Sequence, residues 1–454
     1  MLELAVLAAL CALLIVCVIA GLPVVCPLAA GLLLFWGYGR YRGHGLRELA
    51  RMSISGILTV RGVLTAFILI GVLTAFWRAS GTIAEIVLLA SPLVSPAMAP
   101  LAVFLLCCVM SFLTGTAFGT AATMGVVCMT LATSMDANAL VCGGAVLSGS
   151  YFGDRISPLS TSALLVRVVT RTDLSGNFRA MAKSCALPFA VAIAFYGLAG
   201  FASASNAVAG SVEAIDALGA AFDQGLVALV PAVLVLVLPL LRVDVKGAMG
   251  ASIVAAAAVC VFVRGMAPAD LLRCAVFGFS SANDTIQQLM GGGGLLSMVN
   301  VAVVVCLSSS YSGLFEGTDL LDGVRGHIES LAQHFTPFVA VLIVSIPACM
   351  IACNQTLATM LVQQLCSPVE PDSRSMALDL EDTVILISPL IPWAIACSAT
   401  IQMCSAPELS WLAAVYLWLV PLWRLTLALG ARRIALLDRL QHLFVVSRPV
   451  KANV

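Results

Sequence analysis

The chain has 454 residues, of which 61% are hydrophobic and only 10% are charged, and its formal net charge at pH 7 is zero. Soluble globular proteins carry about 25% charged residues, so this composition excludes a water-soluble globular protein, and the balanced charge gives no basic surface for nucleic acid. The 16 cysteines form no paired CxxC motif and the four histidines show no metal-ligand spacing, so we expect neither a bound metal nor a cofactor.

Apolar segments of about 20 residues, the length that crosses the hydrocarbon core of a bilayer, recur along the whole chain. Two further segments, Asn138–Thr170 and Leu380–Gln402, are also predicted to cross the membrane, although each contains charge or proline. Together these segments predict an all-α membrane protein with ten crossings. The eight apolar crossings are Leu4–Ala20, Leu22–Tyr38, Gly62–Trp77, Cys185–Ser205, Gly225–Leu241, Gly247–Val263, Leu295–Tyr311 and Ser410–Gly430.

Two other segments, Met98–Ser134 and Thr336–Cys366, are interrupted by polar and small residues near their middles. Non-helical backbone at membrane depth is tolerated only where protein or water covers it. We therefore expect each segment to form a re-entrant hairpin, which dips into the membrane and returns to the same side.

Lysine and arginine in the loops orient the crossings, because basic loops stay in the cytoplasm. The loops 40–51 and 171–183 and the tail 431–454 are basic, whereas 206–222 contains acidic residues and no basic one. We therefore expect both termini on the cytoplasmic side of a bacterial inner membrane, with 206–222 as an external linker. Arg264 and Arg273 fit this orientation less well, since the predicted crossings place both on the external side of the membrane.

An internal repeat is visible, because the sequence Ile-Ser-Pro-Leu at 156–159 recurs at 387–390. Shorter matches share nearly the same offset, and the alignment of the two hairpins places Thr120 against Asn354. The repeat divides the chain into residues 1–205 and 223–430, each with five crossings and one hairpin. An odd number of crossings inverts the second half, and inverted repeats with broken helices at the midplane are typical of secondary transporters.

The first broken helix carries one acidic residue, Asp154, at the middle of 138–170. A charge at the bilayer centre costs about 2.5–3.5 kcal/mol even on a lenient insertion scale, so Asp154 should face a cavity or a partner. Gly153 and Pro158 bracket a stretch where the helix can unwind, and proline frees the carbonyl four residues earlier. A structural ion pair with Arg155 is the alternative reading.

Hard oxygen ligands surround Asp154 in the sequence, and such ligands suit an alkali cation or a proton better than a soft metal. In the second half, Pro389 marks the matching helix break, and Glu381 and Asp382 precede it. A water-exposed helix cap is the alternative for these two acids. The predicted ion-binding residues are Asp154, Ser157, Ser160, Thr161 and Asp382.

The hairpin tips are the second part of the predicted site. Glycine and threonine make a poor helix and a tip whose backbone can approach a ligand closely. Helix N-termini after such a tip attract anions, and carbonyl groups before it attract cations. The same composition is also ordinary packing surface between membrane helices. The predicted tip residues are Thr114, Gly115, Thr116 and Thr120 in the first hairpin, and Asn354 and Thr356 in the second.

At 114–120, 152–160 and 380–393 the chain resembles the NhaC-type sodium/proton antiporter family, which also holds malate/sodium-lactate antiporter relatives. The resemblance covers most of the chain and implies sodium movement coupled to protons, in a fold with two hairpins and two broken helices. The family has an aspartate directly after its Ser-Pro-Leu-Ser stretch, where this chain has Thr161. Loss of that carboxylate would weaken cation binding.

These observations predict a transporter rather than an enzyme, with lipid, a monovalent cation and a proton as partners. The leading hypothesis is sodium/proton exchange by competition at Asp154. The alternative is a Na+- or H+-coupled transporter of a small carboxylate or amino acid, such as malate or lactate, held by the hairpin tips. An intramembrane protease is disfavoured, because no histidine lies in a predicted crossing and the sequence lacks an aspartyl-protease motif. Whether the chain forms a homodimer stays open.

Overall fold

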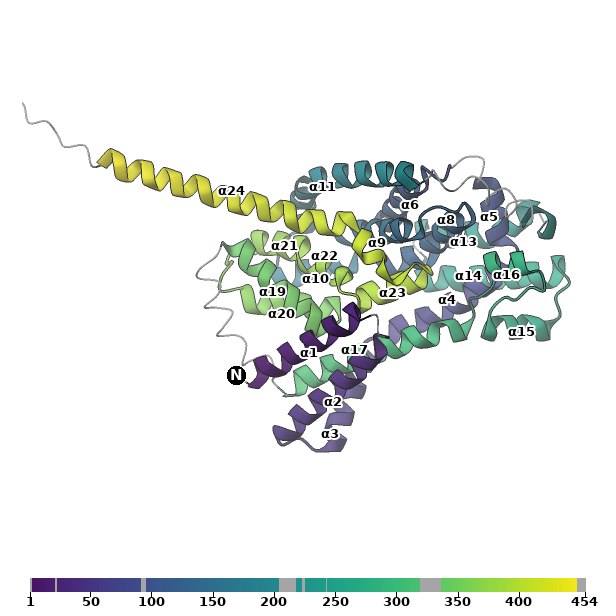
Figure 1. Cartoon of the computed structure of the whole chain (residues 1–454), viewed down its shortest axis with the longest axis horizontal. Helices are drawn as coiled ribbons and strands as arrows, with labels where there is room; N and C mark the ends of the chain where they lie inside the picture. The colour runs from purple at the N-terminus through teal and green to yellow at the C-terminus, as the bar shows by residue number, and fades with distance from the viewer. Residues whose placement is uncertain are drawn as a thin grey trace, which may run out of the picture.

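The computed structural model describes residues 2–20, 23–90, 95–203, 218–222, 225–241, 243–318 and 336–446. These residues form helices with short connections (Figure 1), and within these ranges the only β pairing is an isolated bridge between Phe279 and Gly292. Most of the predicted linker 206–222 and the last eight residues of the chain lie outside the described residues.

The first part of the chain contains three α-helices at the predicted first hairpin and two at the predicted first broken helix. Its elements are α1 (Leu2–Ile19), α2 (Val25–Tyr41), α3 (Leu46–Thr59), α4 (Arg61–Ala79), α5 (Thr82–Ala90), α6 (Ala99–Thr114), α7 (Ala117–Thr120), the π turn η1 (Ala121–Gly125), α8 (Val126–Ser134), α9 (Ala139–Ile156), α10 (Thr161–Thr170) and α11 (Leu174–Ser203).

The second part ends in a long helix, α24, which extends past the rest of the structure (Figure 1). Its elements are η3 (Gly225–Leu229), α13 (Val230–Leu240), α14 (Val245–Ala258), η4 (Val259–Val263), α15 (Pro268–Phe277), α16 (Asp284–Met290), η5 (Leu295–Met298), α17 (Val299–Thr318), α19 (Pro337–Ala352), α20 (Gln355–Cys366), α21 (Ser373–Asp382), α22 (Val384–Ile387), η6 (Ser388–Leu390), α23 (Ile395–Met403), η7 (Glu408–Ala413) and α24 (Val415–Val446).

Six helical segments of the described residues are long and apolar enough to cross a bilayer. A seventh results if 373–390 and 395–403, which meet at 58°, count as one bent crossing. Exposed apolar side chains such as Phe262 and Val168 suit a lipid solvent. The chain is therefore a multi-pass, nearly all-helical membrane protein. The six segments are Arg61–Ala79, Ala117–Ser134, Ser175–Ala202, Val245–Val263, Leu295–Phe315 and Glu408–Gly430.

Five of these six segments coincide with predicted crossings, and the sixth is the second arm of the predicted first hairpin. In that arm α7, η1 and α8 follow one another without a gap, so it is as long as a crossing. Three of the other predicted crossings contain shorter apolar helices, at 8–17, 161–170 and 225–239, which a length criterion alone does not count. The number of crossings predicted from the sequence is therefore larger than the number of span-length helices.

Some helices of the structure lie outside the predicted crossings and hairpins. Helix α3 begins inside the loop predicted at 40–51 and packs along α17. The two backbones touch, because a Cβ atom at Gly56 would lie 2.2 Å from the carbonyl oxygen of Ser309, and one at Gly313 would lie 1.9 Å from that of Met52. Small residues commonly permit such close packing between membrane helices.

The end of α9, which is the first arm of the predicted first broken helix, packs closely against α6. A Cβ atom at Gly153 would lie 2.1 Å from the carbonyl carbon of Ser111, so only glycine fits there. The hydroxyl of Ser111 also donates a hydrogen bond to the backbone oxygen of Ser150. Gly153 was expected to mark the helix break, but it is helical and serves close packing, and α9 continues to Ile156.

Candidate functional site

The two predicted hairpin tips have the same backbone design. Helix α6 ends at Gly115 in the left-handed conformation (φ 67°), and α19 ends at Cys353 in the same conformation (φ 53°). The next residue caps the following helix in both cases, since Thr116 and Asn354 accept hydrogen bonds from backbone N–H groups of α7 and α20. The structure therefore matches Asn354 with Thr116, four residues before the Thr120 that the sequence alignment gave.

Each tip lies against a break in a helix. A Cβ atom at Gly115 would lie 2.5 Å from the carbonyl carbon of Leu159, in the break between α9 and α10. The carbonyl oxygen of Cys353 accepts a hydrogen bond of 2.9 Å from the N–H of Ile395, the first residue of α23. Tip and break thus form one local unit in each part of the chain.

The threonine hydroxyl groups of the first tip donate hydrogen bonds to nearby backbone carbonyl groups. Thr114 donates to the carbonyl of Met110 at 2.9 Å, and Thr120 donates to that of Thr116 at 2.9 Å. The oxygens of Thr114 and Thr120 also lie 3.3 Å apart. In the second tip, the side chain of Thr356 is exposed.

The break between α9 and α10 runs from Ser157 to Ser160, and both serine hydroxyls bond to backbone. Ser157 donates to the carbonyl of Phe112 at 2.6 Å, which fixes the break to α6. Ser160 donates to the backbone oxygen of Asp154, the carbonyl that the break leaves without a helical partner. It also caps α10 by accepting from the N–H of Ser162 at 3.1 Å. Thr161 begins α10 and its side chain is exposed.

Asp154 is buried, and uncharged donors reach its carboxylate from three elements. The hydroxyl of Ser162 in α10 donates to Oδ2 at 2.7 Å. The side-chain amide of Gln355, which donates to the carbonyl of Ile385 at 3.3 Å, and the backbone N–H of Ala117 also lie close enough to this carboxylate to stabilise its negative charge. Ala117 and Gln355 are the first residues of α7 and α20, so both hairpin tips converge on Asp154. In the described part of the chain, no lysine or arginine forms an ion pair with Asp154.

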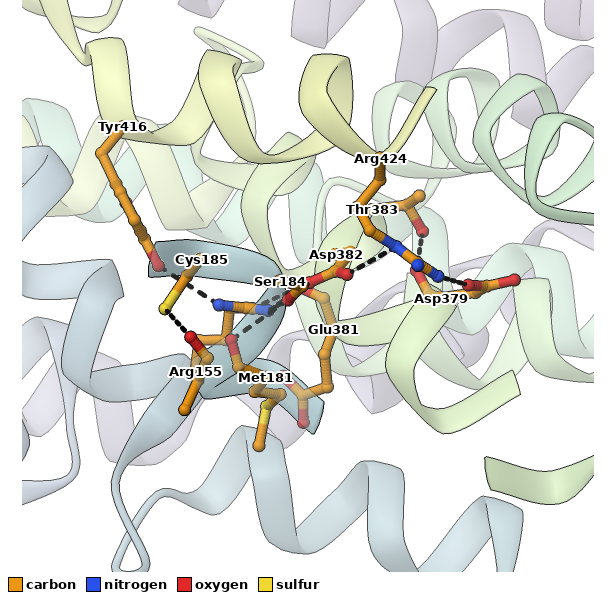
Figure 2. A network of polar contacts seen from close by, with 11 residues as sticks. Arg155, Met181, Ser184, Cys185, Asp379, Glu381, Asp382, Thr383, Tyr416 and Arg424 are labelled. Carbon is orange, nitrogen blue, oxygen red and sulfur yellow. Dashed lines mark hydrogen bonds and ion pairs between the residues drawn. The ribbon is translucent and has the colours of Figure 1, made fainter. Parts of the chain in front are cut away.

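The acidic residues at the end of α21 lie in a buried polar network (Figure 2). Asp382 forms an ion pair with Arg155 through one carboxylate oxygen, and its other oxygen lies 2.9 Å from Nε of Arg424. Arg424 also binds Asp379 at 2.6 Å. The helix is interrupted directly after Asp382. Thr383 has the non-helical angles φ −120° and ψ −82°, and α22 starts at the next residue.

Arg155 connects four elements through this network. Its guanidinium group donates to Ser184 of α11 at 2.8 Å and to the hydroxyl of Tyr416 of α24 at 3.2 Å, besides its ion pair with Asp382 of α21. Its Nε donates to the backbone oxygen of Glu381 at 3.2 Å. The side chain of Arg155 is fully buried, so these contacts replace the water that it would otherwise bind.

The carboxylate of Glu381 is left out of these contacts. Only 1% of this residue is exposed, and neither carboxylate oxygen has a hydrogen-bond partner among the described residues. Figure 2 shows the side chain directed away from the ion pairs, with no dashed line to its carboxylate. It nevertheless lies close enough to Asp154 and Arg155 for their charges to interact.

Comparison with known proteins identifies the family of this chain. Two overlapping segments, residues 78–173 and 149–406, match the Na+/H+ antiporter family. The chain belongs to this family. The match begins at the end of α4 and ends after α23, so it contains both tips, both breaks, Asp154 and Arg155, and Glu381 and Asp382.

Individual members of the antiporter family resemble the chain over most of its length. The malate-2H(+)/Na(+)-lactate antiporter of Bacillus subtilis is 27% identical, over 78% of this chain and 77% of the relative. The Na(+)/H(+) antiporter NhaC of Alkalihalophilus pseudofirmus is 25% identical over 82% of each. The arginine/ornithine antiporter ArcD of Halobacterium salinarum is 26% identical, over 87% of this chain and 84% of the relative. These matches confirm the resemblance to NhaC-type antiporters.

Several residues of this candidate site were absent from the predicted set, among them Ser162, Gln355 and Glu381. Ser162 directly follows the predicted Thr161, and Gln355 lies between the predicted Asn354 and Thr356, so both were within one residue of a prediction. Glu381 was noted in the sequence but not selected. The only available signal for it was an acidic residue inside an apolar segment, and the adjacent Asp382 gave the same signal.

Proposed function

We propose that this chain is a secondary transporter, not an enzyme, and that it exchanges Na+ for H+ by competition at Asp154. One observation carries the proposal: Asp154 is buried, both hairpin tips reach it, and no basic side chain of the described residues forms an ion pair with it. Membership of an antiporter family supports the same conclusion. The proposal does not require a resident cofactor.

The chemistry of Asp154 suits competition between two cations. A buried carboxylate without a basic partner is stabilised by binding either a proton or a metal cation, but one oxygen pair cannot hold both at full strength. Ser162, Gln355 and the N–H of Ala117 hold the carboxylate in place by neutral donors, which orient it without cancelling its charge. Alternating access would then carry Na+ in one direction and H+ in the other.

The proposed transport cycle uses two inverted halves, residues 1–205 and 223–430, joined by an external linker at 206–222. The recurring tip design at Gly115 and Cys353 and the helix breaks beside them support this division. We also propose ten crossings with two re-entrant hairpins, and both termini and the tail 431–454 on the cytoplasmic side of a bacterial inner membrane. The basic loops support this orientation.

Proteoliposomes that contain a pH-reporting dye test the proposed exchange. The wild-type protein is expected to move protons when Na+ or Li+ is added on one side, and Asp154→Asn is expected to abolish this flux with normal expression. Asp136→Asn is a matched control, because Asp136 is exposed and its φ of 53° suits asparagine. Full exchange by Asp154→Asn would contradict the assignment.

A second candidate function is Na+- or H+-coupled exchange of a small carboxylate or amino acid. Two relatives favour it, because the malate/lactate and arginine/ornithine antiporters are about as similar to this chain as the NhaC protein. The exposed Thr161, where the family has an aspartate, is a further difference from cation-only exchange. Malate, lactate, arginine and ornithine, added in turn to the same proteoliposomes, test it. Ion flux that no solute changes would exclude this function.

A further inference from the structure

Two adjacent pairs of charged residues face each other across the site. Asp154 and Arg155 end α9, and Glu381 and Asp382 end α21. The second member of each pair joins the ion pair between Arg155 and Asp382. The first members, Asp154 and Glu381, have no ion pair within the described residues, although each lies next to one. The ion pair therefore brings two unneutralised carboxyl groups close together.

The charges around Glu381 leave a surplus of two negative charges. Arg155 of α9 and Arg424 of α24 are the basic groups, and their ion pairs go to Asp382 and Asp379. Two acids remain for which the network supplies no cation. The charged groups that act on Glu381 are Asp154 and Arg155 of α9 and Asp382 of α21. The other titratable groups of the network face Arg155, Asp382 or Arg424: Cys185 of α11, Asp379 of α21, and Tyr416 and Arg424 of α24.

The two remaining acids differ in their hydrogen bonds. Asp154 accepts a hydrogen bond from Ser162, and the amide of Gln355 and the N–H of Ala117 lie near it, so neutral donors stabilise its negative charge. Glu381 accepts from none in the described part of the chain, although it is fully buried. A buried carboxylate without a donor or a cation is strongly disfavoured, so Glu381 must hold a proton or share a bound cation. The long-range field of Arg155 reduces this cost but does not replace a contact.

We propose that Glu381 is a second proton-carrying group of the transport site, so that two protons are exchanged for each Na+. This inference rests on the proposed exchange at Asp154. When the site faces a proton-rich side, both carboxyl groups hold a proton and the site is neutral. On the other side each O–H bond breaks, two protons leave to water, and one Na+ binds between the two carboxylates. One net positive charge therefore crosses the membrane in each cycle.

The number of protons per Na+ can be read from the gradients at which flux stops. Purified protein in proteoliposomes, with the membrane potential clamped at zero by K+ and valinomycin, is exposed to opposed Na+ and pH gradients. For the wild type, the Na+ ratio that stops flux is expected to equal the square of the proton ratio. For Glu381→Gln the Na+ ratio that stops flux is expected to equal the proton ratio itself. Exchange by this variant should no longer respond to an imposed membrane potential.

Two further variants serve as controls. Glu381→Asp keeps an acid at this position and is expected to retain the wild-type zero-flux ratio, with a shifted pH for half-maximal exchange. Glu408→Gln makes the same chemical change at an exposed position at the start of η7, outside the network, and is expected to behave as wild type. If Glu381→Gln does not fold, an unchanged pH profile in Glu381→Asp overturns the proposal.

The outcomes separate this inference from the exchange function. If Glu381→Gln keeps the wild-type zero-flux ratio, Glu381 carries no proton, although Na+/H+ exchange at Asp154 stands. If Glu381→Gln folds but does not transport, proton release on addition of Na+ to the detergent-purified protein decides. Release reduced to half of the wild-type value supports the inference, and equal release overturns it. A wild-type protein without Na+-dependent proton flux overturns the exchange function itself.

Discussion

Asp154 and Asp382 are both buried aspartates near the end of a helix, but their surroundings differ. Asp382 is held by two arginines, whereas Asp154 is held by a serine, a glutamine and a backbone N–H. Basic partners neutralise a carboxylate and fix it in place, while neutral donors orient it and leave its charge available. The comparison indicates that Asp382 holds the structure together and that Asp154 is the better candidate for binding a transported cation.

The largest expected effect is on stability, when the ion pair at Asp382 loses one partner. Arg155→Met leaves Asp382 with Arg424 alone, and breaking a buried ion pair costs about 3–5 kcal/mol. Equilibrium unfolding in mixed micelles measures the loss. Arg374→Met removes an exposed ion pair of 3.7 Å and is expected to cost less than about 1 kcal/mol. An Arg155→Met protein as stable as wild type would show that this network is not structural.

A smaller loss of stability is expected where α9 touches α6, because this contact sets the position of Asp154. Gly153→Ala places a methyl group 2.1 Å from the carbonyl carbon of Ser111, and such overpacking typically costs about 1–3 kcal/mol. Gly250→Ala in α14 is the matched control, since no atom lies within 4 Å of its added Cβ. It is expected to be neutral or stabilising in the same unfolding measurement. Equal stability of the two variants would contradict the close packing.

The next effect is on ion affinity rather than on stability. Ser162→Ala removes one hydrogen bond to the Asp154 carboxylate, and a bond to a charged group contributes about 1.5–3 kcal/mol. The Na+ concentration for half-maximal exchange is therefore expected to change by about tenfold or more. Ser175→Ala removes a similar bond of 2.9 Å to Asp173 on the surface and should leave exchange unchanged. An unchanged Na+ dependence in Ser162→Ala would remove Ser162 from the site.

The smallest effect is expected where the chain departs from its family. Thr161→Asp restores the aspartate of the family pattern, but the side chain at this position is exposed, and in this structure the next residue, Ser162, contacts Asp154. An acid in the first turn of α10 adds about 0.3–1 kcal/mol of helix stability. The Na+ concentration for half-maximal exchange is expected to change less than threefold, which corresponds to a change in binding free energy of about 0.6 kcal/mol. A tenfold gain in Na+ affinity would show that residue 161 belongs to the site.

The sequence was sufficient for the class of fold and for the family. Low charge and repeated apolar segments required a membrane, and five predicted crossings coincide with span-length helices. Glycine and proline also marked where helices end, since one tip turns at Gly115 and the break after α9 contains Pro158. The predicted role of Asp154 in ion binding stays a prediction.

The partners of the buried charges could not be predicted. Asp382 and Glu381 are neighbours in the same apolar segment, and nothing local shows which of them meets a basic residue. The answer depends on Arg155 and Arg424, which reach α21 from 227 residues earlier and 42 residues later in the chain. Helix α3 was missed for a related reason, because its packing against α17 overrides the polar character of its first turn.

The hydrogen bond from Ile395 to the carbonyl of Cys353 has a mechanical consequence. Cys353 adopts a left-handed conformation that costs a non-glycine residue about 1–2 kcal/mol, so its carbonyl direction is fixed by the fold rather than by preference. When the second tip swings, the start of α23 must follow it or the bond must break. A gate that bends the second tip alone therefore has to break this bond, whereas a gate that moves the tip together with α23 keeps it.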